Sequence, residues 1–262
     1  MITSAIKIDD EHWAEWLDAV AATPKIRHIE CDAALFSFSL DFLKSLDRHS
    51  LYGAHARDIL PPETAKFLNE SPNDLAYNNL RKSIIHSMLS AENAGVSHFS
   101  LQMRLDEPFP DEENRIRKTA AFLRKLILAP LEKPFKLDLQ IRFPFQYPQS
   151  KEWERAIDIC NMADSKRIGL SLQLHSGDFD DSPPPPQEIV TDILPHLHAV
   201  EFHYAPHLGE SLFEDELTEW ADLLKANNFD GLVVFGPHLN PDDDILNHCL
   251  SLQPCADFFQ EA

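Results

Sequence analysis

Three short stretches of this sequence nearly repeat one another: residues 100–105 read SLQMRL, residues 138–143 read DLQIRF and residues 171–176 read SLQLHS. They begin 38 and 33 residues apart, a spacing typical of structural repeats. In each stretch apolar and polar side chains alternate, which is the period of a β-strand with two different faces. Each stretch therefore predicts one strand of a repeated strand–helix unit.

The same alternation of strands and helices continues along the chain. Strand-like apolar runs lie at 4–9, 26–33, 51–59, 98–105, 135–143, 168–175, 198–204 and 231–236, with helical periodicity between them. This order predicts parallel pairing and an α/β fold. Eight units in 262 residues fit a TIM barrel. An open doubly wound sheet usually has a glycine-rich phosphate turn, and the sequence contains seven glycines and no GxGxxG. We predict one (β/α)8 barrel domain over residues 1–262.

Composition narrows the possible partners and the cellular location. The formal net charge of −20 repels nucleic acid and anionic membranes, so we expect neither as a partner. No run of about 18 apolar residues suggests a membrane span, and the first residues do not resemble a secretory signal. The four cysteines are too scattered for a disulfide framework. We expect a cytoplasmic protein, and the sequence leaves its oligomeric state open.

The polar face of each strand is predicted to line the barrel interior. The last inward residues of the third to seventh strands are Arg57, Arg104, Arg142, His175 and His203, above a layer of Gln102, Gln140, Gln173 and Glu201. His55 and Glu30 share the inward face on the third and second strands. Barrel chemistry takes place at the carboxyl ends of strands, and arginines there predict an anion site. A polar core that satisfies its own hydrogen bonds is the alternative.

Residues 135–145 (FKLDLQIRFPF), 167–178 (RIGLSLQLHSGD) and 198–206 (HAVEFHYAP) carry a resemblance to a known family. In them the chain resembles the xylose isomerase-like TIM barrels, which include sugar isomerases, sugar epimerases and related endonucleases. The resemblance implies a divalent metal held by Glu on strand five, Asp with a nearby His on strand six, His on strand seven and Glu on strand eight.

This sequence departs from that metal site at most positions. By the resemblance, His203 matches the strand-seven ligand and His175 is the candidate for the strand-six His; Gln140 or Arg142, Gln173, and Phe235 or Gly236 stand where the carboxylates belong. Hard cations need anionic oxygen ligands. We therefore expect no metal and no other cofactor, with a divalent metal near His203 and His175 as the alternative.

Together these features predict a site for a small polyhydroxylated, anionic ligand, such as a sugar acid or sugar phosphate, at the carboxyl ends of the strands. The candidate ligand-binding residues are His55, Arg57, Gln102, Arg104, Gln140, Arg142 and Gln173. For an enzyme, the resemblance implies isomerisation or epimerisation by proton transfer, with Glu201 or Glu30 as base and His203 or His175 as acid. The alternatives are a catalytically inactive barrel that acts as a ligand sensor or scaffold, and a metal-dependent sugar isomerase with a rearranged site.

Overall fold

The computed structural model describes residues 2–8, 11–23, 25–26, 28–49, 53–59, 75–103, 111–132, 135–143, 152–175, 187–203, 210–236 and 244–260. Its strands are β1 (Thr3–Lys7), β2 (His28–Asp32), β3 (Gly53–Ile59), β4 (His98–Gln102), β5 (Lys136–Phe143), β6 (Ile168–His175), β7 (Leu197–His203) and β8 (Leu232–Gly236). Each strand pairs in parallel with the next, and β1 also pairs with β8, so the sheet curls into a closed barrel.

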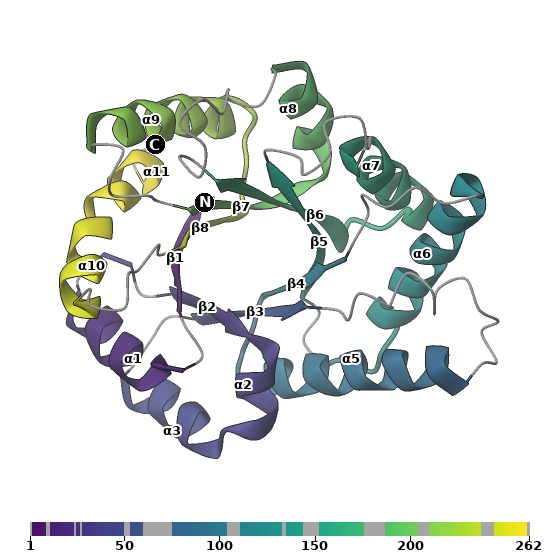
Figure 1. Ribbon diagram of the computed structural model, residues 1–262, viewed down its shortest axis with the longest axis horizontal. Helices are drawn as coiled ribbons and strands as arrows, with labels where there is room; N and C mark the ends of the chain where they lie inside the picture. The colour runs from purple at the N-terminus through teal and green to yellow at the C-terminus, as the bar shows by residue number, and fades with distance from the viewer. Residues whose placement is uncertain are drawn as a thin grey trace.

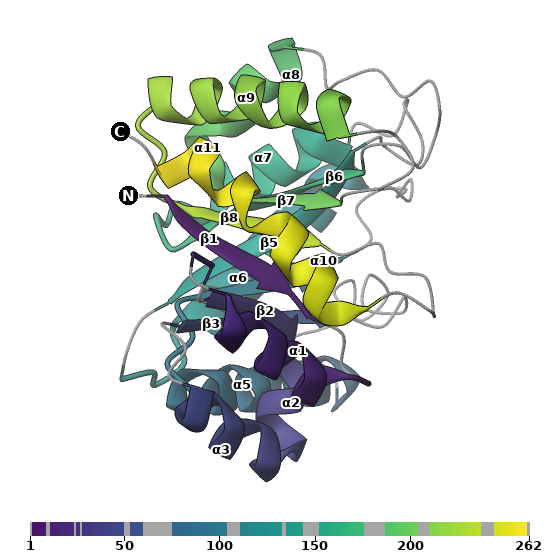
Figure 2. The ribbon, with the colours of Figure 1, turned by 90° about the vertical axis from the view of Figure 1, so that its left-hand side faces the viewer.

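Helices surround the strands as an outer ring (Figure 1). They are α1 (Trp13–Ala22), α2 (Ala33–Phe38), α3 (Leu40–His49), α5 (Leu75–Asn93), α6 (Glu112–Ile127), α7 (Glu152–Ala163), α8 (Gln187–Ile193), α9 (Glu210–Ala226), α10 (Ile245–Leu252) and α11 (Asp257–Gln260), with the 3-10 turns η1 (Leu194–His196) and η3 (Pro254–Ala256). Near the end of the chain, α10 and α11 lie outside β1 and β8 (Figures 1 and 2). The predicted α/β barrel is confirmed.

The main apolar core lies between the strands and this ring of helices. Leu170, Leu172 and Leu174 alternate along β6 and are all buried in it, because successive strand residues point to opposite faces. The ring of Phe202 on β7 stacks on that of Phe235 on β8, with centroids 6.2 Å apart. Packing of this outward face fixes the opposite, polar face toward the barrel axis.

Helix ends follow local sequence signals. Gly95 has a φ of 79° just beyond α5, the left-handed conformation in which glycine often terminates a helix. The Asp32 carboxylate accepts a hydrogen bond from the Ala34 amide and caps α2. The second strand therefore ends at Asp32, one residue before the predicted end, and passes directly into a helix.

The pairing of β6 and β7 contains a register shift. Leu170 pairs with Leu197, but Ser171 pairs with Ala199, so His198 is an extra residue on β7. A Cβ atom on Gly169 would lie 2.4 Å from the His198 ring and 2.6 Å from the backbone oxygen of His196. Only a glycine on β6 leaves room for this arrangement.

The barrel interior is only partly apolar. One small cluster of Ala5, Ala199, Leu232 and Val234 fills the side formed by β1, β7 and β8. Buried polar side chains also face the interior, among them Glu30, Gln140, Gln173 and Glu201. Branched apolar side chains dominate the interior of most TIM barrels, so the polar interior of this barrel differs from that of most members of the fold.

Within the part of the chain that the structure describes, no helix is long and apolar enough to cross a membrane.

Candidate functional site

A buried carboxylate, Glu201, is the centre of the polar interior. Its backbone lies on β7 and its residue surface is 0% exposed. Gln140 on β5 and Gln173 on β6 both donate from Nε2 to Glu201 Oε2, at 3.1 and 2.6 Å. The two glutamines come from two of the repeated stretches, so the repeat places matching amides around one carboxylate.

The other oxygen of Glu201 receives two nitrogen groups. The Lys7 ammonium, at the end of β1, donates to Oε1 and forms an ion pair with it. His203, at the end of β7, places Nε2 2.8 Å from the same oxygen. The side chains of Lys7 and His203 remain 12% and 18% exposed, whereas that of Glu201 is 1% exposed. We call Lys7, Gln140, Gln173, Glu201 and His203 the Glu201 group.

Gly236 at the end of β8 makes room for this group. A Cβ atom there would lie 3.1 Å from Cε1 and Nδ1 of His203 and 3.4 Å from Glu201 Oε1. Since β8 lies between β1 and β7 in the barrel, a side chain at this position would stand between Lys7 and Glu201. The missing side chain on β8 therefore lets residues of β1 and β7 meet.

The charge on Glu201 is fixed by its neighbours. Burial alone raises the pKa of this carboxyl, but the Lys7 ammonium and the contact with His203 more than offset burial and hold the pKa well below its usual range. Glu201 is therefore ionised at neutral pH. A carboxylate stabilised in this way is a weak proton acceptor, because basicity falls with pKa.

Gln140 Oε1 is a buried acceptor of this group that has no described partner. Gln140 is 3% exposed, and its Oε1 accepts no hydrogen bond from the described residues. A buried acceptor without a partner costs about 1–3 kcal/mol. A hydroxyl group of a ligand, or an ordered water, would satisfy it.

The structure places the other candidate residues in different surroundings. Gln102 and Arg142 are exposed at the ends of β4 and β5. Glu30 is buried on β2 at 2% exposure, in register with Lys7. Arg104 and the side chains of Arg57 and His175 lie outside the described residues. Convergence of Arg104, Arg142, His175 and His203 on one cavity therefore stays a prediction.

His55 belongs to a second polar cluster near the amino-terminal ends of the strands, and its described contacts are not with the Glu201 group. Ser97 Oγ lies 3.1 Å from Nδ1 of both His55 and His98, and the His28 ring stacks on His55 with centroids 5.5 Å apart. Asp138 Oδ1 lies 2.5 Å from His198 Nδ1. We call His28, His55, Ser97, His98, Asp138 and His198 the amino-terminal cluster.

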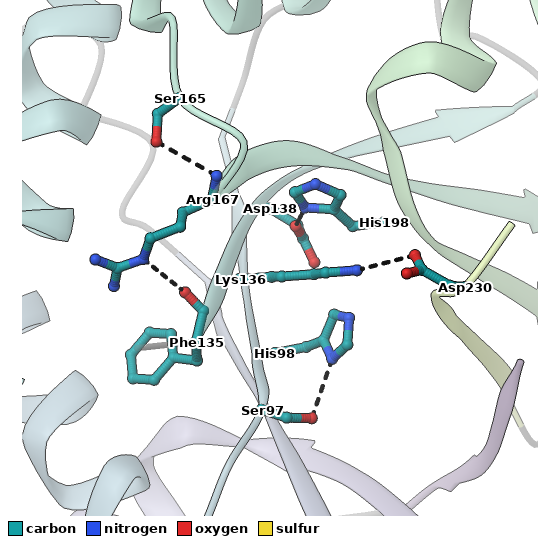
Figure 3. Close-up of polar contacts among 9 residues, drawn as sticks. All are labelled: Ser97, His98, Phe135, Lys136, Asp138, Ser165, Arg167, His198 and Asp230. Atoms are coloured by element: carbon teal, nitrogen blue, oxygen red, sulfur yellow. Dashed lines mark hydrogen bonds and ion pairs between the residues drawn. The ribbon is translucent and has the colours of Figure 1, made fainter. Parts of the chain in front are cut away.

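Figure 3 shows part of this cluster, with His98, Asp138 and His198 beside the Lys136–Asp230 ion pair. Burial lowers the pKa of His98 to about 4; the nearby Asp138 carboxylate opposes this shift, and the Lys136 ammonium adds to it. Burial, together with His98 and His28, lowers the pKa of His55 well below its usual value. These imidazoles are therefore neutral at pH 7.

Lys7 is the member of the Glu201 group that the sequence analysis missed. Its signal was present, because Ile6 and Ile8 on either side are outward and buried, so Lys7 must face inward. His98 and Lys136 also share the inward parity of their strands. His198 could not be found in this way, because the register shift reverses its face.

The residues around Glu201 do not fit the metal site that the resemblance implies. Both carboxylate oxygens are already engaged by N–H groups, and one of them contacts an ammonium. Over the described ranges, no three His, Cys, Asp or Glu side chains lie so that they could hold a metal ion. A dication at this position would share the Glu201 carboxylate with a fixed positive charge.

Comparison with solved structures places the fold. D-psicose 3-epimerase from Clostridium cellulolyticum H10, solved with D-tagatose, superimposes with a TM-score of 0.69 at 11% identity, covering 98% of both chains. The IOLI protein with a binding zinc atom gives 0.63 at 15% identity, again over 98% of both chains. An AP endonuclease of family 2 from Brucella melitensis gives 0.63 at 13% identity, over 97% of this chain and 98% of the other.

The chain therefore has the fold of the xylose isomerase-like barrels, as its resemblance to them predicts. Neither a family model nor a curated protein sequence matches it. At identities this low the likeness extends to the fold alone, so the function must be argued from the site.

Proposed function

We propose that residues 1–262 form one TIM-barrel domain of the xylose isomerase-like type that binds a small carbohydrate-like ligand at the carboxyl ends of its strands and isomerises or epimerises it by proton transfer. The observation that carries this proposal is the Glu201 group. It gathers a carboxylate, an ammonium, an imidazole and two amides at or near the ends of β1, β5, β6 and β7. This is the end at which TIM barrels carry out chemistry.

Within this group we assign proton transfer to His203. The ionised Glu201 holds one ring nitrogen of His203, as a buried carboxylate orients the histidine in a catalytic triad. An imidazole gives or takes a proton near neutral pH, whereas the low pKa of Glu201 makes it a poor base. Glu201 then acts as counter-ion, with Glu30 as an alternative base and His175 as an alternative acid.

The chemistry of the surrounding groups supports a polyhydroxylated ligand. Gln140 Oε1 can accept from a hydroxyl, and amides and imidazoles can exchange hydrogen bonds with further hydroxyls. We retain the proposal that the ligand is anionic, with Arg104 and Arg142 on its charged group and Arg57 as a further ligand-binding residue. The net charge of −20 argues against a nucleic acid as the partner.

A catalytically inactive sensor or scaffold is the second candidate. It is favoured by the hydrogen bonds of Gln140 and Gln173 to Glu201, which satisfy much of the polar interior without a ligand. A metal-dependent isomerase with a rearranged site is less consistent with the ammonium on Glu201.

Isothermal titration against ketoses, sugar acids and sugar phosphates tests the proposal. Any ligand that binds is then incubated with the protein in D2O, and NMR follows exchange of its carbon-bound hydrogens. We expect His203→Gln to abolish exchange, while His86→Gln on the exposed side of α5 serves as the matched control. Binding without exchange would favour the sensor, and no binding across the panel would reject the proposed function.

A further inference from the structure

We infer that the Lys7 ammonium is the fixed cation of this site and binds the carbonyl oxygen of the ligand, so that the substrate is an α-hydroxy carbonyl sugar and no metal ion is needed at Glu201. This inference rests on the proposed function and specifies its substrate class. It makes Lys7 a residue that touches the reacting atoms, with Glu201 as its counter-ion.

The position of Lys7 supports this role. It is the last residue of β1 and reaches past Gly236 to Glu201 on β7, next to His203. The ammonium carries three N–H donors, and the described residues offer it one acceptor, Glu201 Oε1. With its side chain 12% exposed, the ammonium has donors left for a ligand and little water to take them.

The charges in the group favour a neutral carbonyl oxygen that becomes negative during the reaction. Lys7 and Glu201 cancel each other's charge in the resting protein. An oxyanion forming beside the ammonium would be stabilised by a donor that is already in place, which is the most effective form of electrostatic catalysis. In the sugar-isomerase barrels that the chain resembles, a divalent metal supplies positive charge; here the ammonium already contacts the only carboxylate of the group.

The proton-transfer step balances with no further reactant other than water. His203 takes the proton from the carbon next to the carbonyl, and the C–H electron pair forms a C=C bond. The carbonyl π pair moves onto oxygen, where the Lys7 N–H group binds the enediolate. Return of the proton from His203 to the former carbonyl carbon, while the hydroxyl proton of the neighbouring carbon passes to the former carbonyl oxygen, gives the isomer. Protonation of the original carbon on its other face by a water molecule, whose hydroxide then takes the proton held by His203, restores the carbonyl and gives the epimer.

Ligand pairs that differ only in the carbonyl test the contact. Titration compares a ketose with its hexitol on the wild type and on Lys7→Gln, Lys7→Arg and the control Lys25→Gln, which removes a surface ion pair with Asp257. We expect Lys7→Gln to weaken the affinity for the ketose by roughly 10- to 100-fold, because a charge-assisted hydrogen bond is lost. The affinity for the hexitol should stay within about twofold of the wild-type value. Lys7→Arg should retain part of the preference for the ketose over the hexitol, and the control Lys25→Gln should retain all of it.

Two further measurements keep the outcome unambiguous. If Lys7→Gln fails to fold, Lys7→Met combined with Glu201→Gln removes both charges together and should also lose the ketose preference. Wild-type binding should survive dialysis against EDTA. Ketose preference retained without Lys7, or binding lost on chelation and restored by Mn²⁺, would overturn the inference and leave the proposed function standing. Failure of the wild type to bind any carbohydrate would rule out both the inference about Lys7 and the proposed function.

Discussion

Glu201 shows how strongly a single buried charge depends on its neighbours. The two glutamines, the ammonium and the imidazole all direct N–H groups or ring nitrogens at one carboxylate. Desolvating an ion costs several kcal/mol, and the cost is recovered only when the partners remain in place. The interior of this barrel is therefore sensitive to the loss of any one partner.

Lys7→Met should be among the most destabilising substitutions in the chain. It leaves the Glu201 carboxylate buried without its counter-ion, so we expect a loss of about 3–5 kcal/mol in the free energy of unfolding. Denaturant unfolding followed by circular dichroism measures it. The double variant Lys7→Met/Glu201→Gln should recover most of the loss, and an unchanged midpoint for the single variant would show that the ion pair contributes little.

Gly236→Ala tests whether the absence of a side chain at this position of β8 is needed for stability and for ligand binding at the Glu201 group. The new Cβ would lie 3.1 Å from the His203 ring, tighter than ordinary contact, so the ring must shift by a few tenths of an ångström and its contact with Glu201 is disturbed. We expect a cost of about 1–3 kcal/mol in stability, typical of overpacking, and reduced ligand affinity. Ala34, exposed on α2, provides a control in Ala34→Gly, which should weaken folding without changing affinity.

At the scale of elements, the repeated stretches predicted their strands well. The run predicted at 168–175 coincides with β6, because its leucines alternate without interruption and pack against the helices. The run predicted at 98–105 is longer than β4, which ends at Gln102. Period-two reasoning fails on β7, where an extra residue reverses the face of His198. The pairing of two strands, rather than the sequence of either, decides that face.

Gly169→Ala should disturb this irregular pairing. A Cβ atom there would lie 2.4 Å from the His198 ring and 2.6 Å from a backbone oxygen, and the backbone cannot yield as a flexible side chain can. We expect a loss of about 2–4 kcal/mol, above the usual range for overpacking and larger than that for Gly236→Ala. Hydrogen exchange should show faster opening of β6 and β7, and equal losses for the two glycine variants would contradict the ranking.

At the scale of the whole molecule, the polar interior divides into two regions with different consequences. The Glu201 group lies near the carboxyl ends of the strands and is a balanced set of charges. In the amino-terminal cluster, burial keeps the imidazoles of His55 and His98 neutral. Sequence parity indicated that polar residues face inward, but not which ones would meet, since that depends on strand stagger around the closed barrel.

The amino-terminal cluster should make the whole barrel sensitive to acid. Burial lowers the pKa of His98 to about 4 from 6.5, so between these values the unfolded chain binds a proton that the folded chain does not. Stability contributed in this way is complete above pH 6.5 and is lost as the pH falls toward 4. His98 alone then accounts for about 3 kcal/mol, and the lowered pKa values of His55 and His28 act in the same direction.

Unfolding free energies measured from pH 7.5 to pH 4 test this prediction. The titratable and charged groups around His98 are His55, Asp138 and His198, together with the Lys136–Asp230 ion pair. We expect His98→Asn to flatten the pH dependence by up to about 3 kcal/mol across this range, whereas His86→Gln on exposed surface should leave it unchanged. The low pKa of Glu201 adds a further loss only below about pH 4.5, as that carboxylate protonates. If the two histidine variants and the wild type lose stability in parallel as the pH falls, the buried His98 is not the group that responds, and the acid sensitivity of the barrel must come from elsewhere in the interior.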